Sequence, residues 1–226
     1  KYEYYSSENR LPERHHYERG ENWTLRPNQA NAVTAFSNAV NSGRRNLLMY
    51  AVMRFGKSFT SLCCALAIKA CVVLVVSGKA DVKDEWKKTV EGAGNFREYI
   101  FLDGYDLASD ENIIEENRLK NKKVVIFLTL QDLQGDEIKD KHRELFNEQI
   151  DLLIVDETHF GARAESFGKI IENAGYEKSD ISNLNRLEDE NIDINAAEIE
   201  LKQINARIRL HLSGTPYRIL MGHEFQ

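Results

Sequence analysis

The sequence predicts an α/β fold in which a mostly parallel sheet carries helices on both faces. Its apolar runs are nearly continuous instead of alternating with polar residues, which is typical of strands buried on both faces. Polar loops and helical patterns separate these runs, and 226 residues with 42% hydrophobic content can bury one large core. We expect strands near residues 47–51, 72–76, 100–102, 124–128, 152–155 and 209–212.

The run AVMRFGKS, residues 51–58, lies between a predicted short buried strand at 46–50 and a helical segment at 59–70. A strand, a loop and a helix in this order are what a phosphate-binding loop requires. The first N–H groups of a helix are unpaired and carry the positive end of its dipole, so they attract phosphate oxygens. The alternative is a strand, turn and helix with a chance Gly-Lys-Ser.

Three residues of this loop suit the binding of a nucleoside triphosphate. Gly56 lets the backbone approach the phosphates, Lys57 reaches the β- and γ-phosphates, and the Ser58 hydroxyl can ligate Mg²⁺. Ala51 stands where the common pattern has its first glycine. The motif therefore predicts a binding site for ATP and Mg²⁺, with one departure from the common pattern.

Two carboxylates follow the apolar run at 152–155. Asp156 and Glu157 stand at the end of this strand, where an α/β sheet places its ligands. Asp156 would hold Mg²⁺ through water, and Glu157 would orient or deprotonate the attacking water. The alternative is that both acids only cap the strand, but a phosphate loop upstream favours the catalytic interpretation.

Two further motifs lie before and after the two already described. LRPNQ, residues 25–29, precedes the phosphate loop by one helix at 29–42, and LSGTP, residues 212–216, follows the last strand. Together with AVMRFGKS and DETH (156–159), these motifs resemble the first RecA-like domain of superfamily 2 helicases and translocases. The nearest group is the DEAD/DEAH-like motor subunits of type I and type III restriction enzymes. The resemblance covers residues 23–218.

This resemblance implies roles for individual residues. Gln29 would read the adenine edge, Glu157, Lys57 and Asp156 would be catalytic, and Ser58 with Asp156 would hold Mg²⁺. Arg54 and Phe55 depart from the family pattern before Gly-Lys and put the fine shape of the loop in question. The predicted nucleotide-binding residues are Gln29, Arg54, Phe55, Gly56, Lys57, Ser58 and Phe59. The residues expected to couple nucleotide state to the nucleic-acid path are His159, Ser213 and Thr215.

Two further segments resemble nucleic-acid contacts of the family. Gly78 and Lys79 follow the strand at 72–76 and precede a predicted helix that contains Trp86. Thr129 and Gln131 follow the strand at 124–128. Contacts to a phosphate backbone need such donors, not base-specific side chains. Taken alone, each segment also fits a solvated strand end.

Composition restricts the class of protein. The formal net charge of −6 means that any nucleic-acid path must be locally basic. No segment has the apolar length of a membrane span. Cys63, Cys64 and Cys71 lack metal-ligand spacing and are predicted to be reduced core residues of a cytoplasmic protein.

We expect residues 1–24 to be a linker or the end of a preceding domain, packed loosely on the core. Residues 25–226 would be the RecA-like domain, with an acidic, helical insertion at about 161–207. Within it, Asp189, Asn191, Asp193 and Glu200 match four positions of a calcium loop, but Ile194 replaces the glycine that such a loop needs, so we favour a solvated insertion. Because the sequence begins with Lys1, we expect that the natural N-terminus is missing.

The leading hypothesis is the ATP-binding motor domain of a DNA helicase or translocase in a restriction or phage-defence enzyme. A second RecA-like domain, which supplies an arginine in this family, would lie outside the chain, so weak hydrolysis is expected from it alone. Nuclease or methyltransferase domains or subunits would be further partners. One alternative stays open: an ATP-gated module that binds nucleic acid or a partner without sustained motion. Gln29 and the SGT motif together disfavour a P-loop kinase or other non-helicase ATPase. DNA and RNA are both compatible with the motifs, as are strand separation and duplex translocation.

Overall fold

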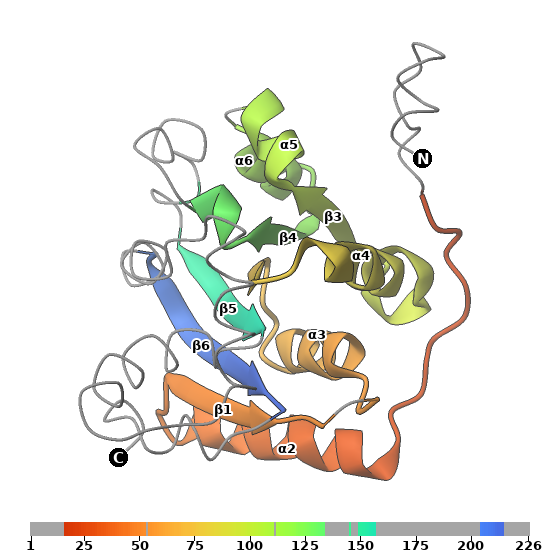
Figure 1. The fold of residues 1–226 in the computed structure, drawn as a ribbon, viewed down its shortest axis with the longest axis vertical. Coiled ribbons are helices and arrows are strands. Elements are labelled where there is room, and N and C mark those ends of the chain that lie inside the picture. The colour runs from red at the N-terminus through yellow and green to blue at the C-terminus, as the bar shows by residue number, and fades with distance from the viewer. Residues whose placement is uncertain are drawn as a thin grey trace, which may run out of the picture.

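The computed structural model describes residues 16–52, 54–110, 112–133, 145, 149–156 and 204–214. Within these residues six strands form one sheet in the order β1-β6-β5-β2-β4-β3, and every neighbouring pair is parallel (Figure 1). The strands are β1 (Asn46–Tyr50), β2 (Val72–Ser77), β3 (Tyr99–Asp103), β4 (Lys123–Thr129), β5 (Ile150–Asp156) and β6 (Ala206–Ser213). The predicted parallel α/β sheet is confirmed.

Helices lie in the crossovers between successive strands from β1 to β4, as parallel pairing requires, and one further helix precedes β1. They are α2 (Pro27–Asn41), α3 (Lys57–Ala67), α4 (Lys83–Gly92), α5 (Gly104–Ser109) and α6 (Ile113–Leu119), with short 3₁₀ turns at Ala80–Val82, Gly94–Phe96 and Gln131–Leu133. Helix α2 begins two residues before the predicted start because Pro27 has no N–H and suits the first turn. Within the described residues, no helix is long and apolar enough to span a membrane.

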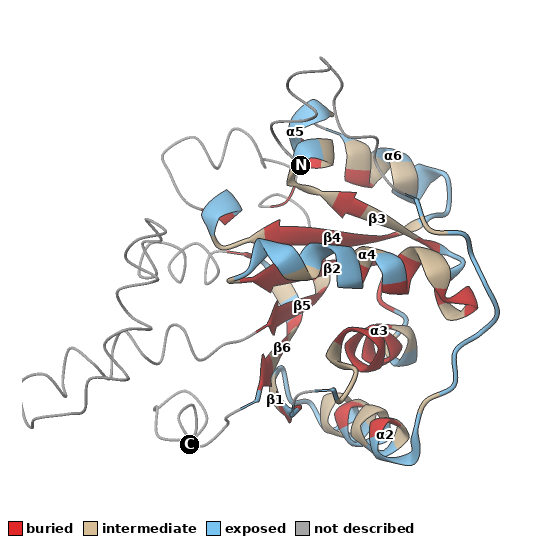
Figure 2. Ribbon diagram, turned by 45° about the vertical axis from the view of Figure 1, so that its right-hand side comes forward, coloured by how far each residue is buried: buried red, intermediate tan, exposed pale blue. Residues whose placement is uncertain are grey.

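Two hydrophobic clusters lie on opposite faces of the sheet (Figure 2). Alternate residues of β2 belong to different clusters: Val73 and Val75 pack with α2, α3 and α4, whereas Leu74 and Val76 pack with α5 and α6. All four side chains are fully buried. This explains the continuous apolar runs, because each strand must be apolar on both faces.

Three details differ from the sequence-based expectations. Strand β1 is less buried than expected: Met49 is buried but Tyr50 is 57% exposed, because β1 pairs only with β6 among the described strands. Strand β6 begins at Ala206, so the last two residues of the expected insertion belong to the sheet; residues 161–203, which include the calcium-like positions, lie outside the described residues. Cys63 and Cys64 are buried as expected, but Cys71 is exposed because it precedes β2.

Residues 16–23 lie along helix α4 and contact its last turns. The Arg19 guanidinium donates to the carbonyls of Val90 and Ala93 at 3.0 and 2.9 Å, and Gly20 N donates to Gly92 O at 2.7 Å. These bonds satisfy carbonyls at a helix end that would otherwise need water. The described part of the N-terminal segment is therefore attached to the helix that follows β2.

Candidate nucleotide-binding site

The parallel sheet gathers the carboxyl ends of its strands at one edge, where ligands bind in such folds. The register pairs Tyr50 at the end of β1 with Ser213 of β6. Ser77 at the end of β2 is paired with Asp156 on one side and with Thr129 on the other. The sheet thus brings together five segments that the sequence analysis selected for their motifs.

The loop after β1 turns sharply into α3 at Gly56. This residue has φ 83° and ψ 52°, a left-handed conformation that glycine adopts without steric cost. Its carbonyl accepts hydrogen bonds from Thr60 N at 3.1 Å and from Thr60 Oγ1 at 2.9 Å, so the first turn of α3 begins directly at the loop. A Cβ at Gly56 would lie 2.7 Å from Gln29 Nε2. The predicted strand, loop and helix are therefore present, with the start of α3 at the loop.

The residues before Gly56 are held by side chains at the N-terminus of α2, from Gln29 and from the preceding residue Arg26. Gln29 Nε2 donates to the Phe55 carbonyl at 2.7 Å, and Gln29 Oε1 accepts from Arg26 N at 2.8 Å. The Arg26 guanidinium donates to the same Phe55 carbonyl and to Arg54 O. Arg54 has φ 63°, a left-handed conformation in which most side chains are strained. Gln29 is 4% exposed, and its amide keeps one N–H and one lone pair beyond these two bonds.

Lys57 reaches across the site to β5. Its Nζ lies 3.1 Å from Asp156 Oδ1, and Asp156 is 5% exposed whereas Lys57 is 28% exposed. The pairing joins the loop cation to the acid that the sequence analysis assigned to Mg²⁺. The predicted convergence of the phosphate loop and the acidic strand end is thus present in the geometry.

Ser58 faces helix α4. Its Oγ donates to Glu85 Oε1 at 3.0 Å and lies 3.4 Å from Thr89 Oγ1. A serine hydroxyl and the Asp156 carboxylate are hard oxygen donors, which suit Mg²⁺ completed by phosphate oxygens and water. The described residues contain no cluster of three or more His, Cys, Asp or Glu side chains that would hold a metal without such help.

The predicted coupling residues are only partly described. Ser213 is fully buried, and its carbonyl accepts from Ala51 N at 3.0 Å, so β6 contacts the first residue of the phosphate loop directly. His159, Thr215 and the predicted catalytic Glu157 lie outside the described residues. Ser213 is therefore in contact with the phosphate loop, and its coupling role stays a prediction.

The Phe59 side chain belongs to the core, so only its backbone remains available to the predicted nucleotide site. The ring is 8% exposed and lies between Trp23, at a centroid distance of 5.5 Å, and Phe96, at 5.9 Å. Phe96 in turn contacts Tyr99 at 6.3 Å. This row of aromatic rings packs the N-terminal segment and α3 against the start of β3 and fixes the first turn of α3.

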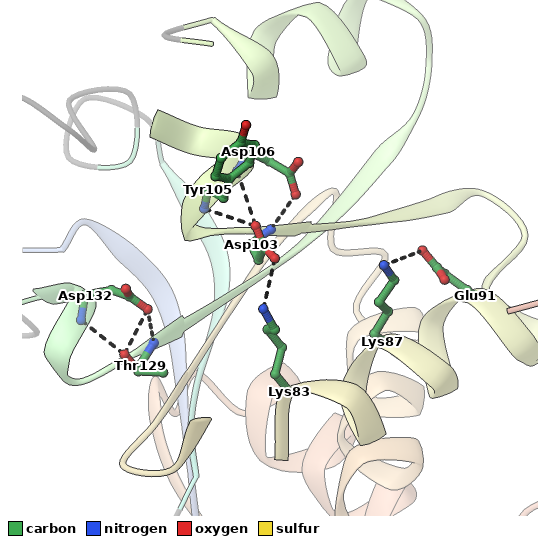
Figure 3. A network of polar contacts seen from close by, with 8 residues as sticks. All are labelled: Lys83, Lys87, Glu91, Asp103, Tyr105, Asp106, Thr129 and Asp132. Carbon is green, nitrogen blue, oxygen red and sulfur yellow. Dashed lines mark hydrogen bonds and ion pairs between the residues drawn. The ribbon is translucent and has the colours of Figure 1, made fainter. Parts of the chain in front are cut away.

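The predicted nucleic-acid residues lie beside the loop at the same edge. Lys79 is exposed and Gly78 is partly exposed after β2, and Gln131 is exposed after β4. Thr129 Oγ1 donates to Asp132 Oδ2 at 2.9 Å and accepts from Asp132 N at 3.1 Å, so its hydroxyl shapes the turn (Figure 3). Lys79 and Gln131 are the more accessible donors of the four.

A further polar network adjoins these turns. Asp103 accepts from the backbone of Tyr105 and Asp106 at the start of α5, and its Oδ2 lies 3.1 Å from Lys83 Nζ (Figure 3). The carboxylate thus caps a helix and is balanced by a cation. The network links the start of α4 to the end of β3.

Sequence reasoning missed Arg26 and Glu85. Arg26 stands in the quoted LRPNQ motif, so its closeness to Gln29 was a usable signal. Glu85 lies on a polar helix 27 residues beyond Ser58, and nothing in its spacing indicates a contact with the loop.

One cavity lies away from these residues, at the amino ends of β1 and β6. It measures about 430 Å³ and is lined partly by Arg45, Lys69 and Arg207. None of the predicted site residues lines it. The candidate nucleotide site is therefore separate from this cavity and lies at the carboxyl ends of the strands, where the sequence motifs meet.

A parallel sheet, a glycine-bearing loop before α3 and a paired lysine and aspartate define an α/β protein of the phosphate-loop class. The chain belongs to the family of the type III restriction enzyme res subunit (ResIII), whose model matches residues 22–218. This family lies within the superfamily 2 helicases and translocases, so the resemblance inferred from the motifs is confirmed. No curated protein sequence matches the chain.

Solved structures share the fold at low sequence identity. The Sulfolobus solfataricus SWI2/SNF2 ATPase core in complex with dsDNA matches 92% of this chain with a TM-score of 0.56 and 14% identity. The ATP-dependent Type ISP restriction-modification enzyme LlaBIII bound to DNA matches 87% with a TM-score of 0.52 and 15% identity. A nuclease-deletion mutant of the Type ISP enzyme LlaGI, with a DNA substrate mimic, matches 86% with a TM-score of 0.51 and 16% identity.

The chain spans 35%, 13% and 18% of those three chains, respectively. Each of them is therefore a much longer protein that includes a domain with this fold.

Proposed function

We propose that this chain is the ATP-binding motor domain of a DNA helicase or translocase belonging to a restriction or phage-defence enzyme. The main observation behind this proposal is the ion pair between Lys57 and Asp156, which joins the phosphate loop to the acidic end of β5. Family membership and the likeness to two restriction-modification enzymes support the proposal.

The site residues suit the binding of ATP with Mg²⁺. The first N–H groups of α3 and the Lys57 ammonium would hold the β- and γ-phosphates. Ser58 and Asp156 would hold Mg²⁺, the latter through water, and the cation would neutralise charge that develops on the phosphates. Gln29 would use its remaining donor and acceptor to read the adenine edge. Glu157 would orient the attacking water.

Binding requires Lys57 to exchange its carboxylate partner for phosphate oxygens. In the structure the Lys57 ammonium forms an ion pair with Asp156. The side chains of Gln29 and Arg26 both donate hydrogen bonds to the Phe55 carbonyl. Nucleotide would therefore compete with contacts within the protein. Ser213, whose carbonyl is bonded to Ala51 N, would carry a loop movement into β6 and toward His159 and Thr215.

Nucleic acid would pass along the same edge of the sheet, where Gly78, Lys79, Thr129 and Gln131 follow β2 and β4. Accessible cations and amides there suit contacts to a phosphate backbone. We propose double-stranded DNA as the substrate and a second RecA-like domain, with nuclease or methyltransferase domains or subunits, as partners. We also propose that the protein acts in the cytoplasm.

The experiment is a steady-state ATPase assay of the complete protein without nucleic acid and with duplex DNA, single-stranded DNA or RNA. Lys57→Ala serves as the blank. Stimulation by duplex DNA is expected from a translocase, and stimulation by RNA alone would replace DNA with RNA as the substrate. If nucleotide binds tightly but no nucleic acid stimulates hydrolysis, the ATP-gated binding module becomes the better account.

A further inference from the structure

A carboxylate outside every sequence motif contacts the loop serine. Glu85 Oε1 accepts a hydrogen bond from Ser58 Oγ at 3.0 Å. One turn further along α4, Thr89 Oγ1 donates to the Glu85 carbonyl at 2.8 Å and lies 3.4 Å from Ser58 Oγ. Helix α4 thus supplies two polar contacts to the hydroxyl that the proposed function assigns to Mg²⁺.

The helix that carries Glu85 is fixed in position. Trp86, Thr89 and Val90 are 2%, 3% and 0% exposed, so one face of α4 is packed into the core next to α3. Arg19 and Gly20 bond to carbonyls at its far end. Glu85 itself is exposed, and its carboxylate reaches Ser58 from a rigid element. A side chain on such an element can orient a neighbour with little entropy cost.

A hydroxyl that binds a cation through a lone pair still has one proton to donate. If a carboxylate accepts that proton, the bond is charge-assisted, the hydroxyl rotor is fixed, and the oxygen becomes a better donor to the metal. Loss of such an outer partner typically lowers metal affinity by about 10- to 100-fold.

We propose that Glu85 is a positioning residue for Mg²⁺: by accepting the Ser58 proton, it turns the serine lone pairs toward the cation. The inference rests on the proposed function, because it assumes that Ser58 ligates the Mg²⁺ of bound ATP. It adds a residue from α4 to a site otherwise built from the loop, α2 and β5.

The test measures binding of a fluorescent ATP analogue to this chain over a range of Mg²⁺ concentrations, and again in EDTA. Glu85→Ala is expected to raise the Mg²⁺ concentration for half-maximal effect by about 10- to 100-fold, with binding in EDTA unchanged. Glu85→Gln keeps an accepting oxygen and is expected to recover part of the loss. A merely structural role would weaken binding in EDTA as well.

Two controls sharpen the result. Asp84→Ala removes a neighbouring carboxylate that contacts Tyr17 instead of Ser58, and it is expected to leave the Mg²⁺ dependence unchanged. In a Ser58→Ala background, Glu85→Ala is expected to have no further effect, since the partner is gone. An unchanged or lower Mg²⁺ requirement in Glu85→Ala, or the same effect with and without Ser58, would overturn the proposal. Failure of the proposed function differs: the wild-type chain would then bind no nucleotide at any Mg²⁺ concentration.

Discussion

Lys57 Nζ lies 3.1 Å from Asp156 Oδ1, although the two residues are 99 positions apart in the chain. Asp156 is buried, and the Lys57 ammonium is a cationic partner for its carboxylate. Desolvated charges are stabilised by partners at this distance. The pair therefore holds the phosphate loop next to β5 while leaving the lysine accessible to phosphate.

The pair predicts how a neutral residue at position 156 would act. Asp156→Asn keeps the shape but removes the charge that holds Lys57 and that repels phosphate. Binding of ATP in EDTA should therefore be equal to wild type or tighter, whereas the gain in affinity from Mg²⁺ should be largely lost. Titration of a fluorescent ATP analogue with and without Mg²⁺ measures both. Weaker binding in EDTA would contradict this role of the pair.

A second prediction concerns substitution of Gly56 by alanine, and the same substitution at Gly43 is its matched control. Both have positive φ values, 83° and 93°, but a Cβ at Gly56 would lie 2.7 Å from Gln29 Nε2, whereas a Cβ at Gly43 would meet nothing within 4 Å. Each change to alanine should cost about 1–2 kcal/mol of backbone strain. Only Gly56→Ala should also abolish nucleotide binding. Chemical denaturation and nucleotide titration of both variants test this, and equal binding by the two would be inconsistent with the loop assignment.

Gln29 predicts the choice of base. Gln29→Glu keeps the length of the side chain and its acceptor but loses the amide that donates to the Phe55 carbonyl and, by our proposal, to adenine. The preference for ATP over GTP should fall by about tenfold, the value of one hydrogen bond of about 1.4 kcal/mol. The preference is measured by the concentrations of ATP and of GTP that displace a bound fluorescent ATP analogue. An unchanged preference in a variant that still binds nucleotide would exclude Gln29 as the adenine reader.

His211 predicts a pH effect on stability. Burial in β6, with a smaller contribution from Arg209, lowers the pKa of His211 from 6.5 to about 4. The unfolded chain therefore binds more protons between these values, so stability present above pH 6.5 is lost as the pH falls toward 4. The loss is on the order of 3 kcal/mol.

The comparison is between wild type and His211→Gln, measured as the free energy of unfolding at pH 7.5, 6, 5 and 4.5. Acidic residues contribute to both curves, so the difference between the curves isolates the histidine. The wild-type curve should fall more steeply below pH 6.5. Parallel curves would show that His211 does not stay neutral in the folded protein.

The sequence predicted the sheet well because strands buried on both faces leave a continuous apolar run, as in β2. It overestimated the burial of β1, because burial depends on which strand lies next in the sheet and strand order does not follow from local pattern. The exposure of Cys71 and the earlier start of β6 have a different origin, because the ends of a strand cannot be located within a residue or two from hydropathy.

In the candidate site, too, some contacts could be predicted from the sequence and others could not. The approach of Lys57 to Asp156 could be predicted because two motifs must meet at the carboxyl edge of a parallel sheet. The contact between Ser58 and Glu85 could not, since it depends on how α4 packs against α3. The two hydrogen bonds that Gln29 and Arg26 donate to the Phe55 carbonyl could not be predicted either. The path of a loop backbone leaves no pattern in the sequence.

Equilibrium binding of ATP in the presence of Mg²⁺ tests the nucleotide assignment most directly. Lys57→Ala is compared with Lys69→Ala, a lysine that lines the cavity at the amino ends of the strands. We predict saturable binding by wild type and Lys69→Ala, and affinity at least about tenfold weaker in Lys57→Ala, consistent with losing about 1.4 kcal/mol or more of charge-assisted bonding. Equal affinity of wild type and Lys57→Ala, or a loss confined to Lys69→Ala, would contradict the assignment.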